Sequence, residues 1–123
     1  MPHIVVEYSA AGHAGFDVAA LMQSLHDAAA STGAMQAADI KIRAHCYADY
    51  LVAGKRDGFC HVSVYLLEGR RPEQKLALSE TLCAAMAALL PATKSLSVDI
   101  RDMDASAYKK RLNPGFSADG EPC

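Results

Sequence analysis

A strand–helix–strand pattern occurs twice along this chain, and the repetition constrains the fold more than any other feature. In the first half, residues 3–8 are rich in β-branched and aromatic side chains, which predicts a strand. Residues 40–45 alternate apolar and polar side chains, as a half-buried strand does. Between them, apolar residues at helical spacing predict a helix that follows Asp17 as its N-cap and ends at Thr32 and Gly33.

The second half repeats this order after a turn-rich segment at residues 53–58. Residues 59–67 predict a strand, and residues 96–101 alternate again. Pro72 suits the first turn of a helix that runs to about Leu90. An offset of 58 residues aligns both strands of each half without a gap, placing His3 on His61, Val6 on Val64, Ile42 on Ile100 and Arg43 on Arg101.

These patterns predict two βαβ units in one domain. The units span about residues 2–52 and 59–104, and the domain spans residues 1–112. Residues 105–112 begin with a predicted short helical turn, and residues 113–123 form a polar C-terminal tail.

The predicted fold is α/β, or more closely α+β: a four-stranded mixed sheet with two helices on one face. Each βαβ unit is expected to be a right-handed crossover with parallel strands, which places both helices on the same side. The other face of the sheet is then bare. We expect that face to be rich in Val, Ile and Leu and therefore to be covered by other subunits, so the sequence predicts an oligomer.

The composition excludes several classes of function. A chain of 123 residues favours one domain, and 12 Lys and Arg against 14 Asp and Glu give a net charge of −2. This balance argues against a nucleic-acid partner or an anionic membrane surface. The apolar run at residues 82–90 is far shorter than the roughly 20 residues that span a bilayer, and residues 1–15 lack a signal-peptide pattern. We therefore expect a cytoplasmic protein.

The cysteines and histidines give no sign of a metal site or a disulfide framework. The four cysteines show no CxxC spacing, and the five histidines show no HxH or HExxH spacing. Cys83 lies in an apolar helical run and is interpreted as a small core residue.

Pro2 is the strongest candidate for chemistry. Removal of the initiator Met before this small residue leaves a secondary amine at the start of the first strand. An α-amino group has a pKa of about 7.7–8.0, and burial or nearby cations lower this pKa, which makes the group a base at neutral pH. The alternative is that Pro2 is only a rigid residue at the start of a strand.

Four cations could complete a binding site for a small dicarboxylate. Lys41 and Arg43 lie two residues apart and therefore share one face of a strand. Arg70 and Arg71 follow the third strand on a loop that leads into a helix. Each alone is typical of a solvated surface charge, but together with a terminal proline they suit an anionic substrate and a developing enolate.

Several of these segments resemble the 5-carboxymethyl-2-hydroxymuconate isomerase family of the tautomerase superfamily. They are the opening MPHIVVEYS, the strand IKIRAH at residues 40–45, the strand HVSV at 61–64 and the loop EGR at 68–70. The resemblance covers roughly residues 2–112, and it fits a chain that holds both βαβ units. It implies a homotrimer with sites at subunit interfaces, Pro2 as the general base, and neither a cofactor nor a metal.

The resemblance also carries individual binding residues onto this sequence. The family's loop arginine falls on Arg70, and its Arg-x-Arg on the second strand falls on Lys41 and Arg43. Lysine keeps the charge but loses the planar fork that grips a carboxylate, so this departure leaves the substrate open. His3, Glu7 and His45 could support the site indirectly, although His3 and His45 are interpreted as structural histidines.

The implied activity is ketonisation of 5-carboxymethyl-2-hydroxymuconate or a close 2-hydroxymuconate, an anionic di- or tricarboxylate, in the bacterial degradation of aromatic acids. Two alternatives remain at this point. One keeps the fold and Pro2 but assigns another enol or keto acid, such as a phenylpyruvate-type enol or a haloacrylate. The other is a trimeric binding protein that retains Met1 and has no catalytic amine.

Overall fold

The computed structural model describes residues 1–114, so almost all of the predicted tail at residues 113–123 lies outside the described part. The first unit consists of β1 (His3–Ser9), α1 (Val18–Ser31) and β2 (Lys41–Tyr47). The second consists of β3 (Phe59–Leu67), α2 (Pro72–Leu89) and β4 (Ser95–Met103). Within residues 1–114, neither α1 nor α2 is long and apolar enough to cross a membrane.

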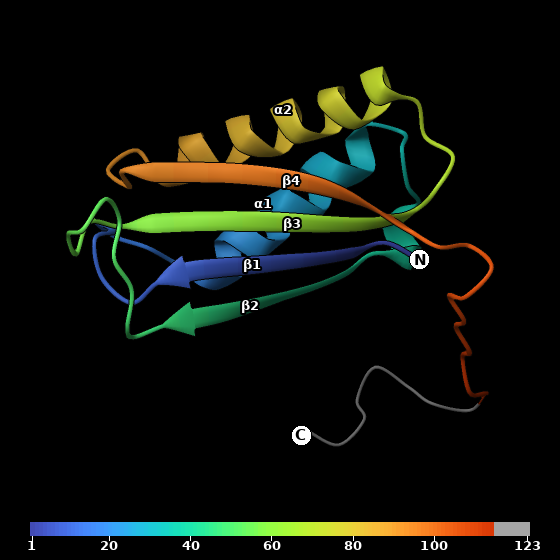
Figure 1. The fold of residues 1–123 in the computed structure, drawn as a ribbon, viewed down its shortest axis with the longest axis horizontal. Helices are drawn as coiled ribbons and strands as arrows, with labels where there is room; N and C mark the ends of the chain where they lie inside the picture. The colour runs from blue at the N-terminus through green and yellow to red at the C-terminus, as the bar shows by residue number, and fades with distance from the viewer. Residues whose placement is uncertain (115–123) are drawn as a thin grey trace.

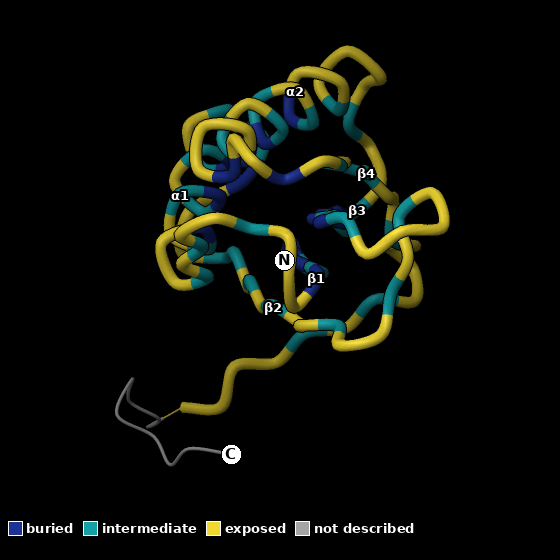
Figure 2. The backbone as a smooth tube through the Cα atoms, turned by 90° about the vertical axis from the view of Figure 1, so that its left-hand side faces the viewer, coloured by how far each residue is buried: buried dark blue, intermediate teal, exposed yellow. Residues whose placement is uncertain are grey.

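The four strands form one mixed sheet in the order β2-β1-β3-β4 (Figure 1). Strands pair in parallel within each unit, whereas β1 and β3 pair antiparallel at the centre. Both helices lie on the same side of this sheet (Figure 2). The predicted fold class is therefore confirmed. A short 3-10 helix, η1 (Ala37–Asp39), precedes β2 and was not anticipated.

Local capping explains where the helices begin and end. Asp17 caps α1 as predicted, because its Oδ1 accepts hydrogen bonds from the backbone N–H groups of Ala19 and Ala20 at 3.0 and 3.3 Å. The chain leaves α1 through Gly33, whose φ of +76° suits glycine. Pro72 opens α2, where its missing N–H costs nothing.

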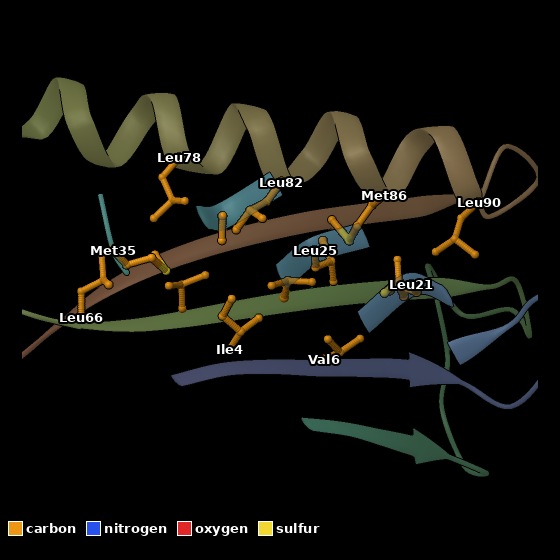
Figure 3. Packing of buried hydrophobic residues seen from close by; sticks show 14 residues of the cluster. Ile4, Val6, Leu21, Leu25, Met35, Leu66, Leu78, Leu82, Met86 and Leu90 are labelled. Carbon is orange, nitrogen blue, oxygen red and sulfur yellow. The ribbon is translucent and has the colours of Figure 1, made fainter. Parts of the chain in front are cut away.

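The hydrophobic core lies between the sheet and the helices (Figure 3). Alternate residues of β1 and β3 point toward the helices and are fully buried, among them Ile4, Val6, Val62 and Val64. They meet Leu21 and Leu25 of α1 and Leu78, Leu82 and Met86 of α2. Residues at helical spacing on α1 and α2 thus pack against residues at every second position of the strands.

One core assignment is wrong. Cys83 is only half-buried, because it lies beside the inward-facing row of α2 that Leu82 and Met86 occupy. The fully buried cysteine is Cys60 on β3, and burial raises the pKa of its thiol to about 11. Cys60 therefore behaves as a small apolar side chain.

The expectation of an apolar bare face is also wrong. The two-residue period sends Ile42, Ala44, Val98 and Ile100 toward the helices, together with the core residues of β1 and β3. The opposite face is mostly polar and aromatic, and its side chains include His3, Glu7, Lys41, Arg43, His45, His61, Tyr65, Asp99 and Arg101. The premise from which the oligomer was predicted therefore fails, whatever covers this face.

The far end of the sheet, where β1 ends and β3 begins, is closed by polar contacts. Ser9 is fully buried, and its Oγ lies 2.9 Å from His13 Nε2 and accepts a hydrogen bond from the Phe59 N–H at 3.0 Å. The backbones of Gly12 and Gly58 touch here, because a Cβ on Gly12 would lie 2.4 Å from the Gly58 nitrogen. No side chain fits between the two segments at this point.

We predict that Leu82→Ala lowers the free energy of unfolding by about 2–5 kcal/mol, since it empties a fully buried site. Leu76→Ala makes the same chemical change on the same helix at a side chain that is 58% exposed, and is expected to cost less than about 0.5 kcal/mol. Urea unfolding at one fixed protein concentration measures both. Equal losses in the two variants would contradict the packing described.

Candidate functional site

The antiparallel pairing of β1 with β3 creates the candidate site. In this register His3 lies opposite Tyr65, so the end of β3 and the loop that follows it come to the start of β1. Pro2 is buried there, and its carbonyl oxygen accepts a hydrogen bond from the Lys41 N–H at 3.1 Å. The second residue of the chain is thereby fixed between the start of β2 and the end of β3.

A pocket of about 250 Å³ lies at this point. Its wall comes from three places: the chain start with Pro2, the connection from α1 to β2 at residues 33–36 with Asp39, and the end of β3 with Leu66, Leu67 and Arg70. The volume is at the small end for ligand sites and suits a compact ligand. The structure thus brings Pro2 and Arg70, two of the four predicted site residues, to one pocket.

Arg70 is held in place by backbone carbonyls. Its guanidinium donates hydrogen bonds to the Leu67 oxygen at 2.9 Å and to the Ala34 oxygen at 2.8 Å. A guanidinium carries five N–H donors, so this anchoring leaves donors for an anion in the pocket. Arg71, by contrast, is exposed, and its Nε donates to Glu73 Oε1 at 2.6 Å on the surface of the helix.

Lys41 and Arg43 share a strand face as predicted, but that face is the bare side of the sheet. Arg43 lies opposite Val5 and donates a hydrogen bond from a terminal guanidinium nitrogen to His3 Nδ1 at 3.2 Å. Arg43 and His3 line a shallow hollow of about 260 Å³ together with Tyr65 and Met103. Within one chain, Arg43 therefore does not line the Pro2 pocket.

The three side chains considered as indirect supports also face the bare side. His3 contacts Arg43 and, through Nε2, the Tyr108 hydroxyl at 3.0 Å, and burial beside Arg43 lowers its pKa. Neutral His3 then accepts at Nδ1 from Arg43 and donates from Nε2 to Tyr108. Glu7 accepts a hydrogen bond from the Tyr47 hydroxyl, which raises the pKa of Tyr47, and His45 packs edge-on against the same ring.

The pKa of the amine at the chain terminus is lowered from its usual value. Burial is the largest cause, and the positive charges of Lys110, Lys41 and Arg70 act in the same direction. The carboxylate of Asp39 opposes them. The terminal amine in this structure is that of Met1, and Pro2 lies one residue deeper, in the same surroundings.

Asp39 and Lys110 were missed by the sequence reasoning. They form an ion pair with Nζ and Oδ1 3.7 Å apart, and Asp39 is part of the pocket wall. The basic run at residues 109–111 was the available signal, but nothing in its spacing connects it to the start of the chain. In the described residues 1–114, no three His, Cys, Asp or Glu side chains gather as a metal site would require.

Comparison with solved structures finds the same fold in several proteins. The structure described as "Q0 fused 4-OT wild type symmetric trimer" is 28% identical, with a TM-score of 0.72 over 94% of this chain and 95% of that one. Pt0534, inactivated by 2-oxo-3-pentynoate, is 20% identical, with a TM-score of 0.78 over 94% and 96%. A 5-carboxymethyl-2-hydroxymuconate isomerase from Deinococcus radiodurans R1 is 23% identical, with a TM-score of 0.72 over 91% and 90%.

Two further comparisons were with curated protein sequences and with models of protein families. Curated protein sequences give no match. The family model described as 5-carboxymethyl-2-hydroxymuconate isomerase matches residues 2–114, which is nearly the whole chain. The protein therefore belongs to the 5-carboxymethyl-2-hydroxymuconate isomerase family and is an isomerase with the tautomerase fold.

Proposed function

We propose that this protein ketonises 5-carboxymethyl-2-hydroxymuconate or a close 2-hydroxymuconate, with Pro2 as the mature N-terminus and general base. The observation that carries this proposal is the pocket that holds both Pro2 and the anchored guanidinium of Arg70. Family membership supports the substrate class, and the reaction suits a place in the degradation of aromatic acids.

The proposed reaction needs one proton transfer in each direction. The neutral amine of Pro2 takes the proton of the substrate's 2-hydroxyl group. This leaves a dienolate conjugated along the substrate's carbon skeleton. The resulting prolinium then returns the proton to a carbon further along the conjugated system. No covalent intermediate forms, and the amine ends the cycle neutral.

The cations stabilise the anionic substrate and the dienolate. Arg70 binds a carboxylate from inside the pocket through its free N–H groups. Arg43 and Lys41 lie on the bare sheet face. In a homotrimer that buries this face, they would border a site at a subunit interface rather than the pocket of their own chain. Two of the similar solved structures are described as symmetric trimers, which supports this assembly.

Lys41 also suits a second substrate class, another enol or keto acid. Lysine presents a point charge where the resembling family has an arginine fork, so a substrate that needs only one bidentate contact suits this site as well. An absorbance assay with 2-hydroxymuconates, a phenylpyruvate-type enol and a haloacrylate separates the two classes. The highest kcat/KM with a compound other than a 2-hydroxymuconate would replace the proposed substrate.

We predict that intact mass shows loss of one methionine and that Pro2→Ala lowers kcat/KM about tenfold or more without unfolding. A primary amine still accepts a proton, so the loss stays below the roughly 10²–10⁴ that a general base contributes. Circular dichroism checks the fold. Retention of Met1 in the purified protein, or wild-type activity in the variant, would exclude the amine as the base.

The pH profile gives a separate prediction. The base acts only when neutral, so kcat/KM falls as the pH drops through the pKa of the Pro2 amine. Burial and nearby cations lower the pKa of the Met1 amine, and Pro2 lies one residue deeper in the same surroundings. We therefore expect activity to persist below the usual range of about 7.7–8.0 for an α-amino group. A pH profile in which kcat/KM falls only above neutral pH, with no decrease at acidic pH near the pKa of the amine, contradicts this assignment.

Arg70→Ala is expected to lower kcat/KM by a factor that corresponds to about 2 kcal/mol or more of lost transition-state stabilisation, since it removes a bidentate partner for the substrate carboxylate. Arg71→Ala removes an equal charge one residue away, and its change in kcat/KM should correspond to less than about 0.5 kcal/mol of transition-state stabilisation. Steady-state kinetics give the split: a rise in KM alone indicates ground-state binding, and a joint fall in kcat indicates stabilisation of the enolate. Equal damage from both variants would refute the ranking.

Light scattering is expected to give three times the chain mass of 13.1 kDa. Val5 lies at the centre of the bare face, opposite Arg43 and Ser63, so Val5→Glu should shift the mass toward the monomer by burying a charge. Val5→Thr, which keeps the shape, serves as the control. A stable monomer in the wild-type protein would remove both the assembly and the interface site.

A further inference from the structure

The segment after β4 returns to the start of the chain. After β4 the backbone makes a single turn, in which the N–H groups of Ala107 and Tyr108 donate to the Asp104 oxygen at 3.1 and 2.9 Å. Glu68 Oε1 accepts a hydrogen bond from the Ala105 N–H at 3.0 Å, and Tyr108 reaches His3. These anchors hold residues 104–110 against the end of β3 and the beginning of β1.

Two adjacent lysines on this segment have different surroundings. Lys109 is exposed, whereas the side chain of Lys110 is only 14% exposed and its Nζ lies 3.7 Å from Asp39 Oδ1. An ion pair at this distance on a freely exposed surface contributes little. Here the pair is partly shielded from water, and one member belongs to the wall of the Pro2 pocket.

The charge of the pocket wall determines how the Lys110–Asp39 pair affects anion binding. The two ionised side chains that line the pocket are Arg70 and Asp39, and their charges cancel. A carboxylate in the wall repels an anionic ligand and reduces the benefit of the arginine. The pocket therefore favours an anion only when a further cation offsets Asp39.

We propose that Lys110 is a positioning residue that neutralises Asp39 and so leaves the pocket beside the chain terminus positive enough to bind a dicarboxylate. The proposal rests on the proposed function, because it concerns the same pocket. It assigns a role in substrate binding to the segment after β4, which lies outside both βαβ units.

The same contact acts on the terminal amine. The charged and titratable groups around that amine come from every neighbouring element: Asp39 from η1, Lys41 from β2, Arg70 from the loop after β3, Lys110, and His3 on β1. Asp39 favours the protonated amine, whereas the three cations favour the neutral one. Loss of Lys110 leaves Asp39 unopposed by its partner and should raise the pKa of the amine.

The test compares Lys110→Gln with Lys109→Gln, which removes the same charge from the exposed neighbour. The readouts are the Kd of maleate, a simple dicarboxylate, and the titration of the terminal amine by 15N NMR of protein labelled at its first residue. Lys110→Gln should raise the Kd about three- to tenfold and shift the amine pKa upward, while Lys109→Gln should change neither. Asp39→Asn in the Lys110→Gln background should restore both values.

A merely structural role predicts a different result. The segment keeps its anchors at Ala105 and Tyr108 in Lys110→Gln, so its fold should persist, and loss of packing would not be rescued by Asp39→Asn. Equal effects of the two lysine variants, no rescue in the double variant, or no binding of maleate by the wild-type protein would each overturn the proposal.

Both readouts are independent of turnover. A response of the amine to Lys110→Gln in a protein that does not convert any 2-hydroxymuconate would sink the proposed function and leave the role of Lys110 standing. Normal turnover with unchanged maleate affinity in Lys110→Gln would do the reverse. In each case, the intact mass of the protein shows whether Pro2 or Met1 is the N-terminal residue that carries the amine.

Discussion

The antiparallel pairing of β1 with β3 is the contact on which the rest of this molecule depends. Each βαβ unit alone is a two-stranded sheet with two open edges. The pairing covers one edge of each unit and joins them into one sheet with a shared core. It also fixes what lies beside the start of the chain. Parallel pairing would place the end of β3 at the far end of β1, and Arg70 would then be separated from Pro2 by the length of the strand.

The two-residue alternation along the strands determines how charge is distributed over the two faces of this sheet. Apolar residues at every second position meet the helices, so the alternating positions carry the polar and ionisable side chains. Any neighbour that covers this face must therefore satisfy His3, Glu7, Arg43 and their partners rather than simply exclude water from apolar surface. An assembly through this face would be specified by hydrogen bonds and charge complementarity, which select one geometry more strictly than apolar contact does.

Periodicity predicted the elements and their order because it reports on burial within each element. It predicted the strand at residues 3–8, the cap at Asp17 and the start of α2 at Pro72, all within a residue or two of the observed bounds. The contacts between distant segments were not accessible in this way. The pairing of Lys110 with Asp39 joins residues far apart in sequence, and the half-buried position of Cys83 depends on which row of α2 meets the sheet. The polar bare face was available from the alternation itself, since Lys41 and Arg43 occupy positions opposite to Ile42 and Ala44.

The polar closure at the far end of the sheet has a consequence for how many sites one chain can hold. Under the 58-residue offset, the position equivalent to Pro2 is Cys60, and the position equivalent to Arg70 is Gly12. Cys60 carries an ordinary peptide nitrogen, which is not basic. Gly12 packs its backbone against Gly58 at the place that corresponds to the pocket at the other end of the sheet. The two ends of the sheet are thus related in topology but not in chemistry. Joining two units in one polypeptide leaves a single basic terminus per pair, and the end that lacks it is filled by backbone and by Ser9.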